Sequence, residues 1–550
     1  MGLRYEFTSV PTGERAQQLN TVANVPGLVS FNAPQPTYTG LAPRFGINWA
    51  PDEKTSIRAG FGIAYDVLFD NLGTLSFPPE YSVTEDVGTA QFPAGPNFLK
   101  NGGLPPGTGS GTISYPNTPA GIGAARAATS AYLPNQVLPY SENYTLTVQR
   151  TFGSAYTAEI GYIGTRGIHL PTQDQINIQQ KVTPTNVLPT VMGSTTLEAA
   201  GSGATTLSAI TTLSNIVPAW HFPADNYGGF TAKVTSYQPY SESNYNAFIA
   251  NLTRRLQKGF QMNLSYTWSK TMDDATDEVF ATVLTPRRQQ NHQCIACDYS
   301  RSALDRTHRI SLEVVYDVPF YKTSSNFLMK NLVGNWVIAP VYTYESPEYA
   351  TVLSGVNSVQ NGDTAQAIDR PLVNPSGVKG TATGTVAIVN PSLVSKCDPT
   401  ATSGPSQITG KAAANGVYSV CAYDVTGYSA GTLSGTAFTP VTNAYYVEAN
   451  TGTQPTAARN TLPIRPIDNI DLSLFKRLTV REHYSLEVGI QTWNILNHAQ
   501  YQPGTVDNVN GPSYTAAYSF QTVSSSSFNH PEKEFLNNPR TMQISGKIIF

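Results

Sequence analysis

The sequence predicts an all-β fold, an antiparallel transmembrane β-barrel of the bacterial outer-membrane type with about twelve strands. Three observations lead to this prediction. Apolar and polar residues alternate with a period of two in segments spread over the whole 550-residue chain. The connections between these segments alternate between short and very long. The polar positions carry small, hydroxylated and occasionally charged side chains, which suit a water-filled interior.

Composition narrows the class of protein before any segment is considered. Asp, Glu, Lys and Arg make up 13% of the chain, about half of the roughly 25% found in an ordinary soluble domain. Gly (44), Pro (39) and Tyr (30) are abundant, which disfavours a helical bundle or a coiled coil. The net charge is −3 and no Lys/Arg block occurs, so we expect no nucleic-acid partner. The sequence also contains no run of about 18 apolar residues that would form a transmembrane helix.

Alternation is clearest along Phe260–Lys270, where large apolar residues from Phe260 to Trp268 are separated by Gln, Asn, Ser and Thr. Ser56–Asp66 and Arg309–Val318 show the same period. A helix would scatter the apolar side chains around its circumference, so each segment is predicted as a strand with one apolar face. Similar runs complete the set of predicted strands: Leu3–Phe7, Arg44–Trp49, Tyr140–Arg150, Tyr156–Tyr162, Tyr245–Leu256, Trp336–Glu345, Asn469–Lys476, Tyr484–Asn494 and Thr541–Phe550.

The lengths of strands and connections favour a membrane barrel. Most predicted strands have about ten residues, close to the nine to eleven that cross a bilayer when tilted. Short connections occur at Pro51–Lys54, Gly153–Ser154, Gln257–Gly259 and Arg477–His483. Long ones occur at Thr8–Pro43, Val67–Pro139, Thr165–Asn244, Thr271–His308, Ser346–Asp468 and Ile495–Pro539. The pattern places short turns in the periplasm and long loops outside the cell. Residues 1–550 are thus predicted as one barrel domain whose main extracellular loops are 67–139, 165–244 and 346–468.

One connection departs from this pattern. Pro319–Asn335 falls where a short turn is expected, yet it is of intermediate length.

Chemistry favours lipid over a dry core as the environment of the apolar faces. Charged residues on the polar faces, Arg58, Glu159, Glu313 and Glu487, are predicted to face the lumen. The last predicted strand ends in an aromatic residue, Phe550. Aromatic residues near the strand ends suit the interfacial girdle: Trp49, Tyr65, Tyr140, Tyr266, Trp268, Tyr316 and Trp336. The alternative is a multi-sheet extracellular β-protein.

The four cysteines, Cys294, Cys297, Cys397 and Cys421, lie in predicted loops. Two local disulfides in an oxidising compartment are the favoured interpretation. A zinc site built from Cys294, Cys297 and His292 is an alternative, but a second pair at structural-zinc spacing is missing from the sequence. Free thiols are the remaining alternative.

Asp273, Asp274, Asp277 and Glu278 cluster just after the strand that ends at Lys270. Carboxylates suit calcium, but the spacing and the glycine of an EF-hand are missing. A solvated extracellular loop is therefore the favoured interpretation.

Enzymatic chemistry finds no support in the sequence. No Gly-x-Ser-x-Gly elbow lies between a predicted strand and a helix. We therefore predict no catalytic residue, no cofactor and no metal ligand.

Several stretches resemble the C-terminal β-barrel of Oar-like TonB-dependent outer-membrane receptors. They are Ala42–Trp49, Lys54–Asp66, Glu159–Leu170, Asn244–Ala247, Leu264–Lys270, Asp305–Arg309, Trp493–His498 and Asn538–Arg540. The resemblance implies a location in the outer membrane of a Gram-negative-type bacterium, with contacts to outer-membrane lipid and to the barrel-assembly machinery through the C-terminal strand. It also indicates that Asp305, Arg306, His308 and Arg309 organise the start of a strand through ion pairs and backbone hydrogen bonds.

The departures from the family pattern matter as well. The sequence before Leu3 contains no signal peptide, TonB box or plug domain, and a complete barrel of this kind has about 22 strands. We therefore expect a C-terminal part of a receptor, which either needs the missing N-terminal half or closes imperfectly as a smaller barrel. TonB becomes a partner only if a plug is supplied.

The predicted function is that of a receptor or transporter barrel segment, in which extracellular loops capture an unknown ligand that passes through a polar lumen. One alternative is a surface adhesive or structural barrel protein. Another is a non-functional remnant of a receptor. Ligand specificity lies in loops whose conformations the sequence does not fix.

Overall fold

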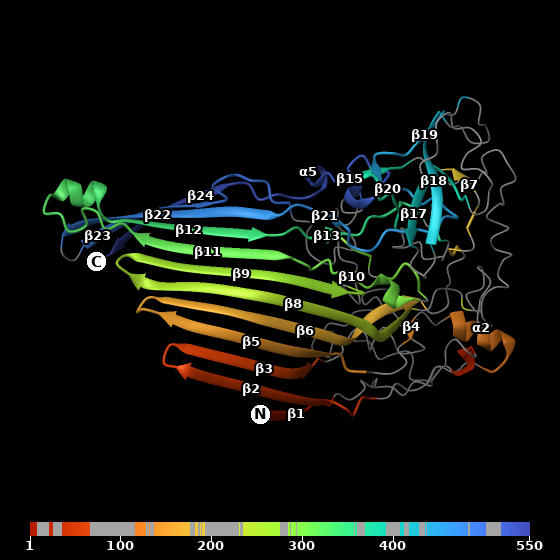
Figure 1. Cartoon of the computed structure of the whole chain (residues 1–550), viewed down its shortest axis with the longest axis horizontal. Coiled ribbons are helices and arrows are strands. Elements are labelled where there is room, and N and C mark those ends of the chain that lie inside the picture. Colours follow the sequence, from red (N-terminus) through yellow and green to blue (C-terminus); the bar gives the residue numbers. More distant parts are fainter. Residues whose placement is uncertain are drawn as a thin grey trace, which may run out of the picture.

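The computed structural model describes residues 1–7, 21–25, 36–66, 116–127, 131–132, 137–175, 182–184, 187–188, 190–192, 230, 235–275, 284–286, 288–292, 294–356, 358–359, 369–384, 386–391, 407–411, 417–427, 435, 437–481, 484–501 and 519–549. A large antiparallel sheet forms one end, and a smaller β-rich region forms the other (Figure 1). Among these residues, no helix is long and apolar enough to cross a membrane.

Twelve strands of the large sheet follow one another in the order of the sequence, each antiparallel to the next. They are β1 Gly2–Tyr5, β2 Leu41–Asp52, β3 Thr55–Tyr65, β5 Tyr140–Phe152, β6 Tyr156–Gln175, β8 Thr235–Gln257, β9 Phe260–Asp273, β11 His308–Asp317, β12 Trp336–Glu345, β22 Ile467–Arg481, β23 Tyr484–Trp493 and β24 Thr541–Ile549. Two short strands join it at the side, β4 (Ala131–Tyr132) on β8 and β10 (Ser300–Arg301) on β9. All twelve predicted strands are confirmed.

Tight hairpins connect the strands at one end of the sheet, as predicted (Figure 1). In the β8–β9 hairpin, Gln257 pairs with Phe260 across a two-residue turn. Both turn residues have positive φ, 52° at Lys258 and 76° at Gly259. This is the backbone that follows the twist of the flanking strands. A Cβ at position 259 would lie 2.5 Å from the Asp317 carbonyl oxygen, so the position requires glycine.

The register joins the apolar residues of all these strands into one continuous face. Directly opposed residues share a face of the sheet. One such row passes through Leu252, Leu264, Leu312, Tyr342 and Ile470, on five successive strands. Many large side chains on this face are exposed, as Ile47 (71%), Trp268 (57%) and Ile544 (76%) are, which suits contact with lipid.

The opposite face is polar along the same strands. Asn251, Ser265, Ser311, Thr343 and Asn469 form the neighbouring row of the sheet. A shift of the register by one residue would exchange the two faces. The observed register therefore keeps the hydroxyl and amide groups away from the apolar face.

Charged residues limit the apolar face at both ends. Towards the long loops, Arg166 lies opposite Asn244 and forms a 2.9 Å ion pair with Glu242. Towards the hairpins, the Arg254 guanidinium lies over the Phe260 ring, 4.8 Å from its centroid. From Asn244 to Arg254, β8 advances about 33 Å at 3.3 Å per residue. With a strand tilt of about 40° this gives about 25 Å, the height of the apolar band of outer-membrane barrels.

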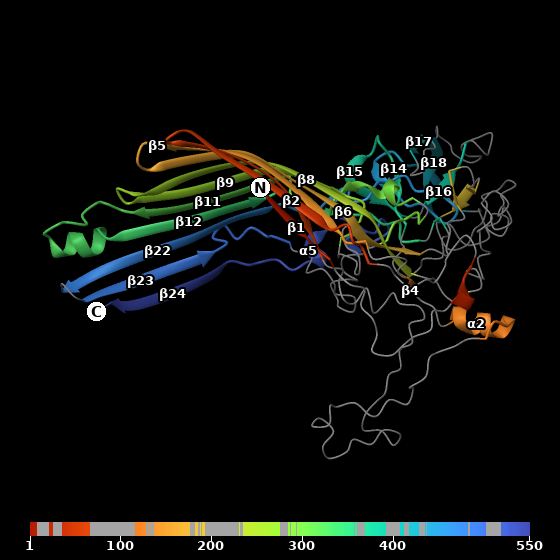
Figure 2. The ribbon, with the colours of Figure 1, turned by 90° about the horizontal axis from the view of Figure 1, so that it is seen from below.

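The sheet is curved but open (Figure 2). Within the described residues, β1 pairs only with β2, and β24 pairs only with β23. The expectation of an imperfectly closed smaller barrel is therefore not met by these strands.

The long connections fold into further β-structure, which we call the extracellular module after the side of the membrane that the sequence predicts for it. Its strands form small sheets of two, three and five strands. They are β7 Thr190–Met192, β13 Tyr349–Ala350, β14 Leu372–Val373, β15 Val378–Thr383, β16 Val386–Val389, β17 Gln407–Lys411, β18 Val417–Thr426, β19 Ala437–Pro440, β20 Ala444–Val447 and β21 Leu462–Pro463. The described helices are short: η1 Thr21–Ala23, α2 Pro119–Ala127, η4 Ile295–Asp298, η5 Met329–Val333 and α5 Pro531–Glu534.

The prediction of long loops over 346–468 and 165–244 did not include the strands that these segments contain. Strand β16 is buried along its whole length and pairs with β7 on one side and with β18 on the other. A strand buried on both faces shows no alternation, so the period-two criterion misses it. The expected boundary at Thr165 was wrong, since β6 continues to Gln175 and pairs there with the start of β8.

Two hydrophobic cores hold the extracellular module together. One gathers residues between Val182 and Ala449, including Val386, Ile388 and Val420. The other joins Leu284, Val352, Tyr446, Leu462, Phe520 and Phe535, which come from three different long connections. Burial of these side chains is the main stabilising term for the module.

Candidate ligand-binding site

The segment Asp305–Arg309 connects the module to the sheet. The Thr271 backbone N–H donates to the Asp305 carboxylate (2.6 Å), and Arg301 forms a 2.7 Å ion pair with the same group. Arg306 reaches Glu348 at 2.6 Å, and Arg309 reaches Glu345 at 2.9 Å. The predicted role of this segment, to organise the start of a strand through ion pairs and backbone hydrogen bonds, is confirmed.

The acidic cluster after Lys270 is not a solvated loop where the structure describes it. Asp273 and Asp274 are 4% and 5% exposed. Asp273 forms a buried ion pair with Arg459, and Asp274 accepts hydrogen bonds from the Ser241 hydroxyl and the Glu242 backbone N–H. The solvated-loop interpretation was wrong for these two, because an arginine far along the chain compensates the buried charge. Asp277 and Glu278 lie outside the described residues.

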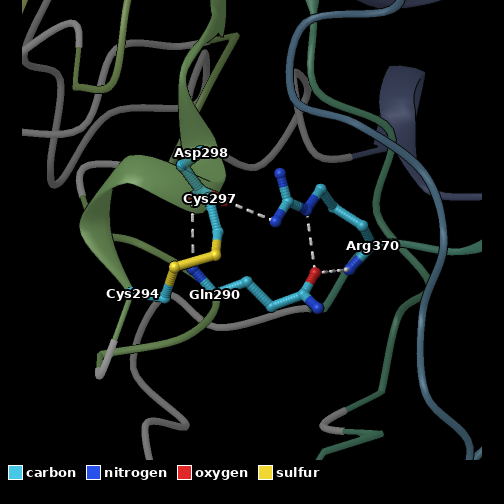
Figure 3. Close-up of a disulfide and its surroundings, with 5 residues drawn as sticks. All are labelled: Gln290, Cys294, Cys297, Asp298 and Arg370. Carbon is cyan, nitrogen blue, oxygen red and sulfur yellow. Dashed lines mark hydrogen bonds and ion pairs between the residues drawn. A yellow bond between two sulfur atoms is a disulfide. The ribbon is translucent and has the colours of Figure 1, made fainter. Parts of the chain in front are cut away.

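Cys294 and Cys297 form a disulfide across the start of η4 (Figure 3). Disulfide sulfurs are not thiolate ligands, so the alternative of a zinc site with His292 is wrong. His292 instead lies 3.0 Å from Asp174. Cys421 is also disulfide-bonded and fully buried, whereas Cys397 lies outside the described residues.

The disulfide-bonded turn is attached to the rest of the module by Arg370 (Figure 3). The Arg370 guanidinium donates to Asp298 at 2.6 Å and to the Gln290 side-chain carbonyl at 2.8 Å. The preceding residue, Asp369, accepts from the Ser358 hydroxyl and the Val359 N–H. Burial raises the pKa of Asp369 from 3.8 to about 7.

A cavity of about 620 Å³ lies where the module meets the ends of β9 and β10. Lys270 and Met272 of β9 and Arg301 of β10 line its sheet side. The module contributes residues of β13, β20 and β21, the segment before β21, and Asn529. This volume is within the range of small-molecule sites.

The cavity lining is strongly basic. No Asp or Glu is among its described lining residues. Five basic side chains line it: Lys270, Arg301, Lys379, Arg459 and Arg465. Arg301 and Arg459 are compensated by Asp305 and Asp273. Lys270, Lys379 and Arg465 form no ion pair with the described part of the chain. The lining therefore carries an excess positive charge that suits an anionic ligand.

Three tyrosines add aromatic surface to the lining. The Arg301 guanidinium lies over the Tyr349 ring, 4.2 Å from its centroid. Tyr445 packs edge-on against Tyr446, with ring centroids 4.8 Å apart. The Tyr446 hydroxyl donates to Thr461 at 2.9 Å, and burial raises its pKa to about 12, so it stays protonated at neutral pH.

The sequence did not reveal this site, because its basic residues are far apart in the chain and form no motif. Residues of 346–468, one of the loops predicted to capture a ligand, line the cavity. Residues from the connections 271–308 and 495–539 line it as well. No described residue of 67–139 or 165–244 lines it.

The residues predicted to face the lumen all lie on the polar face of the large sheet. Arg58 is opposite Asn48 and Thr147, and Glu313 is opposite Asn263. The other two make side-chain contacts there: Glu159 accepts from Asn251 (3.1 Å), and Glu487 pairs with Arg477 (2.8 Å). None of the four lines the cavity, and Phe550 lies outside the described residues.

Residues 1–543 match the family described as "outer membrane beta barrel domain". The chain belongs to this family. It is therefore an outer-membrane β-barrel protein of the bacterial cell, with the all-β antiparallel fold that the sequence predicts. The family is not one of enzymes, in agreement with the prediction from the sequence. No curated protein gives a significant match.

Solved structures of outer-membrane proteins resemble the chain only distantly. A mutant of the ferric enterobactin receptor PfeA from Pseudomonas aeruginosa is 10% identical at a TM-score of 0.36, with 95% of this chain and 41% of that chain covered. The outer membrane transporter YddB from Escherichia coli is 9% identical (TM-score 0.34; 92% and 40% covered). The siderophore receptor PirA from Acinetobacter baumannii is 8% identical (TM-score 0.34; 94% and 41% covered). This outer-membrane barrel protein thus spans less than half of the length of each.

Proposed function

We propose that this chain is the barrel segment of an Oar-like TonB-dependent outer-membrane receptor or transporter, and that its extracellular module captures an anionic ligand. The observation that supports the proposal is the basic cavity between the module and the ends of β9 and β10. Its three cations that form no ion pair with the described part of the chain would bind carboxylate, phosphate or sulfonate groups, and its tyrosines would contact an aromatic or apolar part of the ligand.

The polar face of the sheet supports a route for the ligand. Hydroxyl, amide and charged groups follow this face from the module end to the hairpin end, as the rows through Asn251 and Glu487 illustrate. In the proposed receptor, further strands complete the barrel at the edges of β1 and β24, since unpaired backbone groups are costly in lipid. Strand β24 would contact the barrel-assembly machinery, and TonB would act through a plug domain.

Binding of a small aromatic anion tests the capture step. The purified full chain in detergent should bind phenyl phosphate in a calorimeter, and the double variant Lys270→Gln/Lys379→Gln should bind at least tenfold more weakly. Lys547→Gln, which removes a charge on the polar face of β24 away from the cavity, is the matched control and should leave affinity unchanged. Equal affinity of the double variant and the control would contradict the proposal.

The genomic sequence upstream of Met1 tests the assignment to TonB-dependent uptake. An in-frame signal peptide, TonB box and plug domain would support it. A promoter and ribosome-binding site directly before Met1 would instead favour the adhesive or structural alternative.

A further inference from the structure

The connection between β11 and β12, Pro319–Asn335, is an ordered structure rather than a long turn. The Asn326 side-chain oxygen accepts from the backbone N–H groups of Leu328 (3.0 Å) and Met329 (3.2 Å), which caps a short helical segment over 327–333. The Gly334 N–H closes the segment on the Met329 carbonyl (2.9 Å). A Cβ at position 334 would lie 2.8 Å from the Tyr321 carbonyl oxygen, so glycine is required for this close approach.

This connection exposes an unusual amount of apolar surface. Six large side chains stand out from it: Phe320 (64%), Tyr321 (51%), Phe327 (64%), Leu328 (62%), Leu332 (66%) and Val333 (45%). In Figure 1 the helical segment projects beyond the hairpin ends of β11 and β12, away from the extracellular module. Contiguous exposed apolar surface of this kind marks a contact with another apolar phase.

The connection lies on the lipid-facing side of the sheet. Trp336 and Lys476 are opposed in the register and belong to the apolar face, since Ile338 and Leu474 follow them on the same side. The Trp336 indole N–H donates to the Leu332 carbonyl (3.2 Å), and the Lys476 ammonium donates to the Gly334 carbonyl. Two side chains of the lipid-facing surface thus hold the connection beside that face of the sheet.

The charges of the connection match a phospholipid surface. Residues 319–335 contain two lysines, Lys322 and Lys330, and no acidic residue. Lys322 also pairs with Asp317 at the end of β11. Segments that lie in a membrane interface typically combine basic groups with aromatic and aliphatic side chains that enter the acyl region.

We propose that Pro319–Asn335 is an interfacial anchor, which inserts Phe327, Leu328 and Leu332 among the acyl chains of the periplasmic leaflet and places Lys322 and Lys330 at the phospholipid phosphates. The anchor fixes the depth of the hairpin end of the sheet in the membrane. This inference depends on the outer-membrane fold and is independent of the ligand and of TonB.

Photocrosslinking in isolated outer membranes tests the anchor. p-Azidophenylalanine replaces Phe327 or Leu332 of the full chain, and mass spectrometry identifies the adducts after illumination. p-Azidophenylalanine in place of Ile544, on the lipid-facing surface of β24, is the positive control that establishes insertion. The same residue in place of Leu536, which is 85% exposed just before β24, is the control outside the bilayer. We expect phospholipid adducts at 327 and 332 with yields similar to that at 544 and at least ten times that at 536.

Two other outcomes would overturn the anchor. Adducts with a periplasmic protein or with a second copy of the chain would make the connection a protein-binding surface. The absence of adducts at both positions, in membranes where Ile544 labels phospholipid, would place the connection in water.

Discussion

The Arg370 Nη2 atom lies 2.6 Å from the Asp298 Oδ1 atom, and these side chains are only 7% and 4% exposed. This ion pair joins the last residue of η4, directly after Cys297 of the disulfide, to the segment just before β14 (Figure 3). A buried ion pair thus joins two long connections, 271–308 and 346–468.

Replacement of Arg370 by methionine should destabilise the extracellular module by about 3–5 kcal/mol, because it leaves the buried Asp298 carboxylate without its cationic partner. Hydrogen exchange of the Val386–Val389 amides in the module measures this loss. Arg166→Met is the matched control. It removes an ion pair whose partners are 46% and 51% exposed, so the expected loss is below about 1 kcal/mol. Equal exchange rates in the two variants would refute the importance of burial here.

Removal of the disulfide by the double substitution Cys294→Ser/Cys297→Ser should cost about 2 kcal/mol, the chain-entropy value for so short a loop. We expect faster hydrogen exchange in η4 and at Gln290, with no change in β24. A reducing agent added to the unmodified chain should also speed hydrogen exchange in η4. Unchanged exchange in η4 would show that the Arg370 contacts suffice without the covalent bond.

A charge placed on the apolar face should be far more costly than the same charge on the polar face. Leu264 and Ser265 are consecutive in β9, and their neighbours across the sheet are leucines and Asn or Ser, respectively. Leu264→Arg should destabilise the barrel by about 2–4 kcal/mol, whereas Ser265→Arg should have little effect. Unfolding by urea in phospholipid vesicles measures both. The opposite order would mean that the faces were assigned the wrong way round.

The stability of the module should fall as the pH rises from about 4 to about 7. Asp369 and Glu448 are buried, and burial raises both pKa values to about 7, from 3.8 and 4.5. In this window the folded protein keeps protons that the unfolded chain has released, so a rise in pH favours unfolding, and the effect ends above the folded pKa. Thermal midpoints between pH 4.5 and pH 8 test this.

Asp369→Asn should flatten part of this dependence, since the amide oxygen still accepts from Ser358 and Val359 but carries no charge. Asp52→Asn is the control, because Asp52 is exposed at the end of β2. If Asp369→Asn and the unmodified chain lost stability equally, Asp369 would not be the group responsible.

The candidate cavity could not be predicted from the sequence, for a physical reason. Lys270, Arg301, Lys379 and Arg465 meet only because three long connections share the hydrophobic core around Tyr446 and Phe520. No local sequence pattern indicates which cation will lie near a carboxylate that is distant in the chain. The burial of Asp273 against Arg459 was missed for the same reason.

The sequence by itself determined the twelve strands of the large sheet, their antiparallel order and the two faces. Side chains of a strand alternate between its two faces, so the local sequence determines which residues face lipid and which face water. Each hairpin then sets the register of the strand that follows it. Only the tertiary structure decided that the long connections condense into a module, that basic residues gather at its base and that Pro319–Asn335 lies beside Trp336. These arrangements depend on packing between segments distant in the chain, which periodicity does not encode.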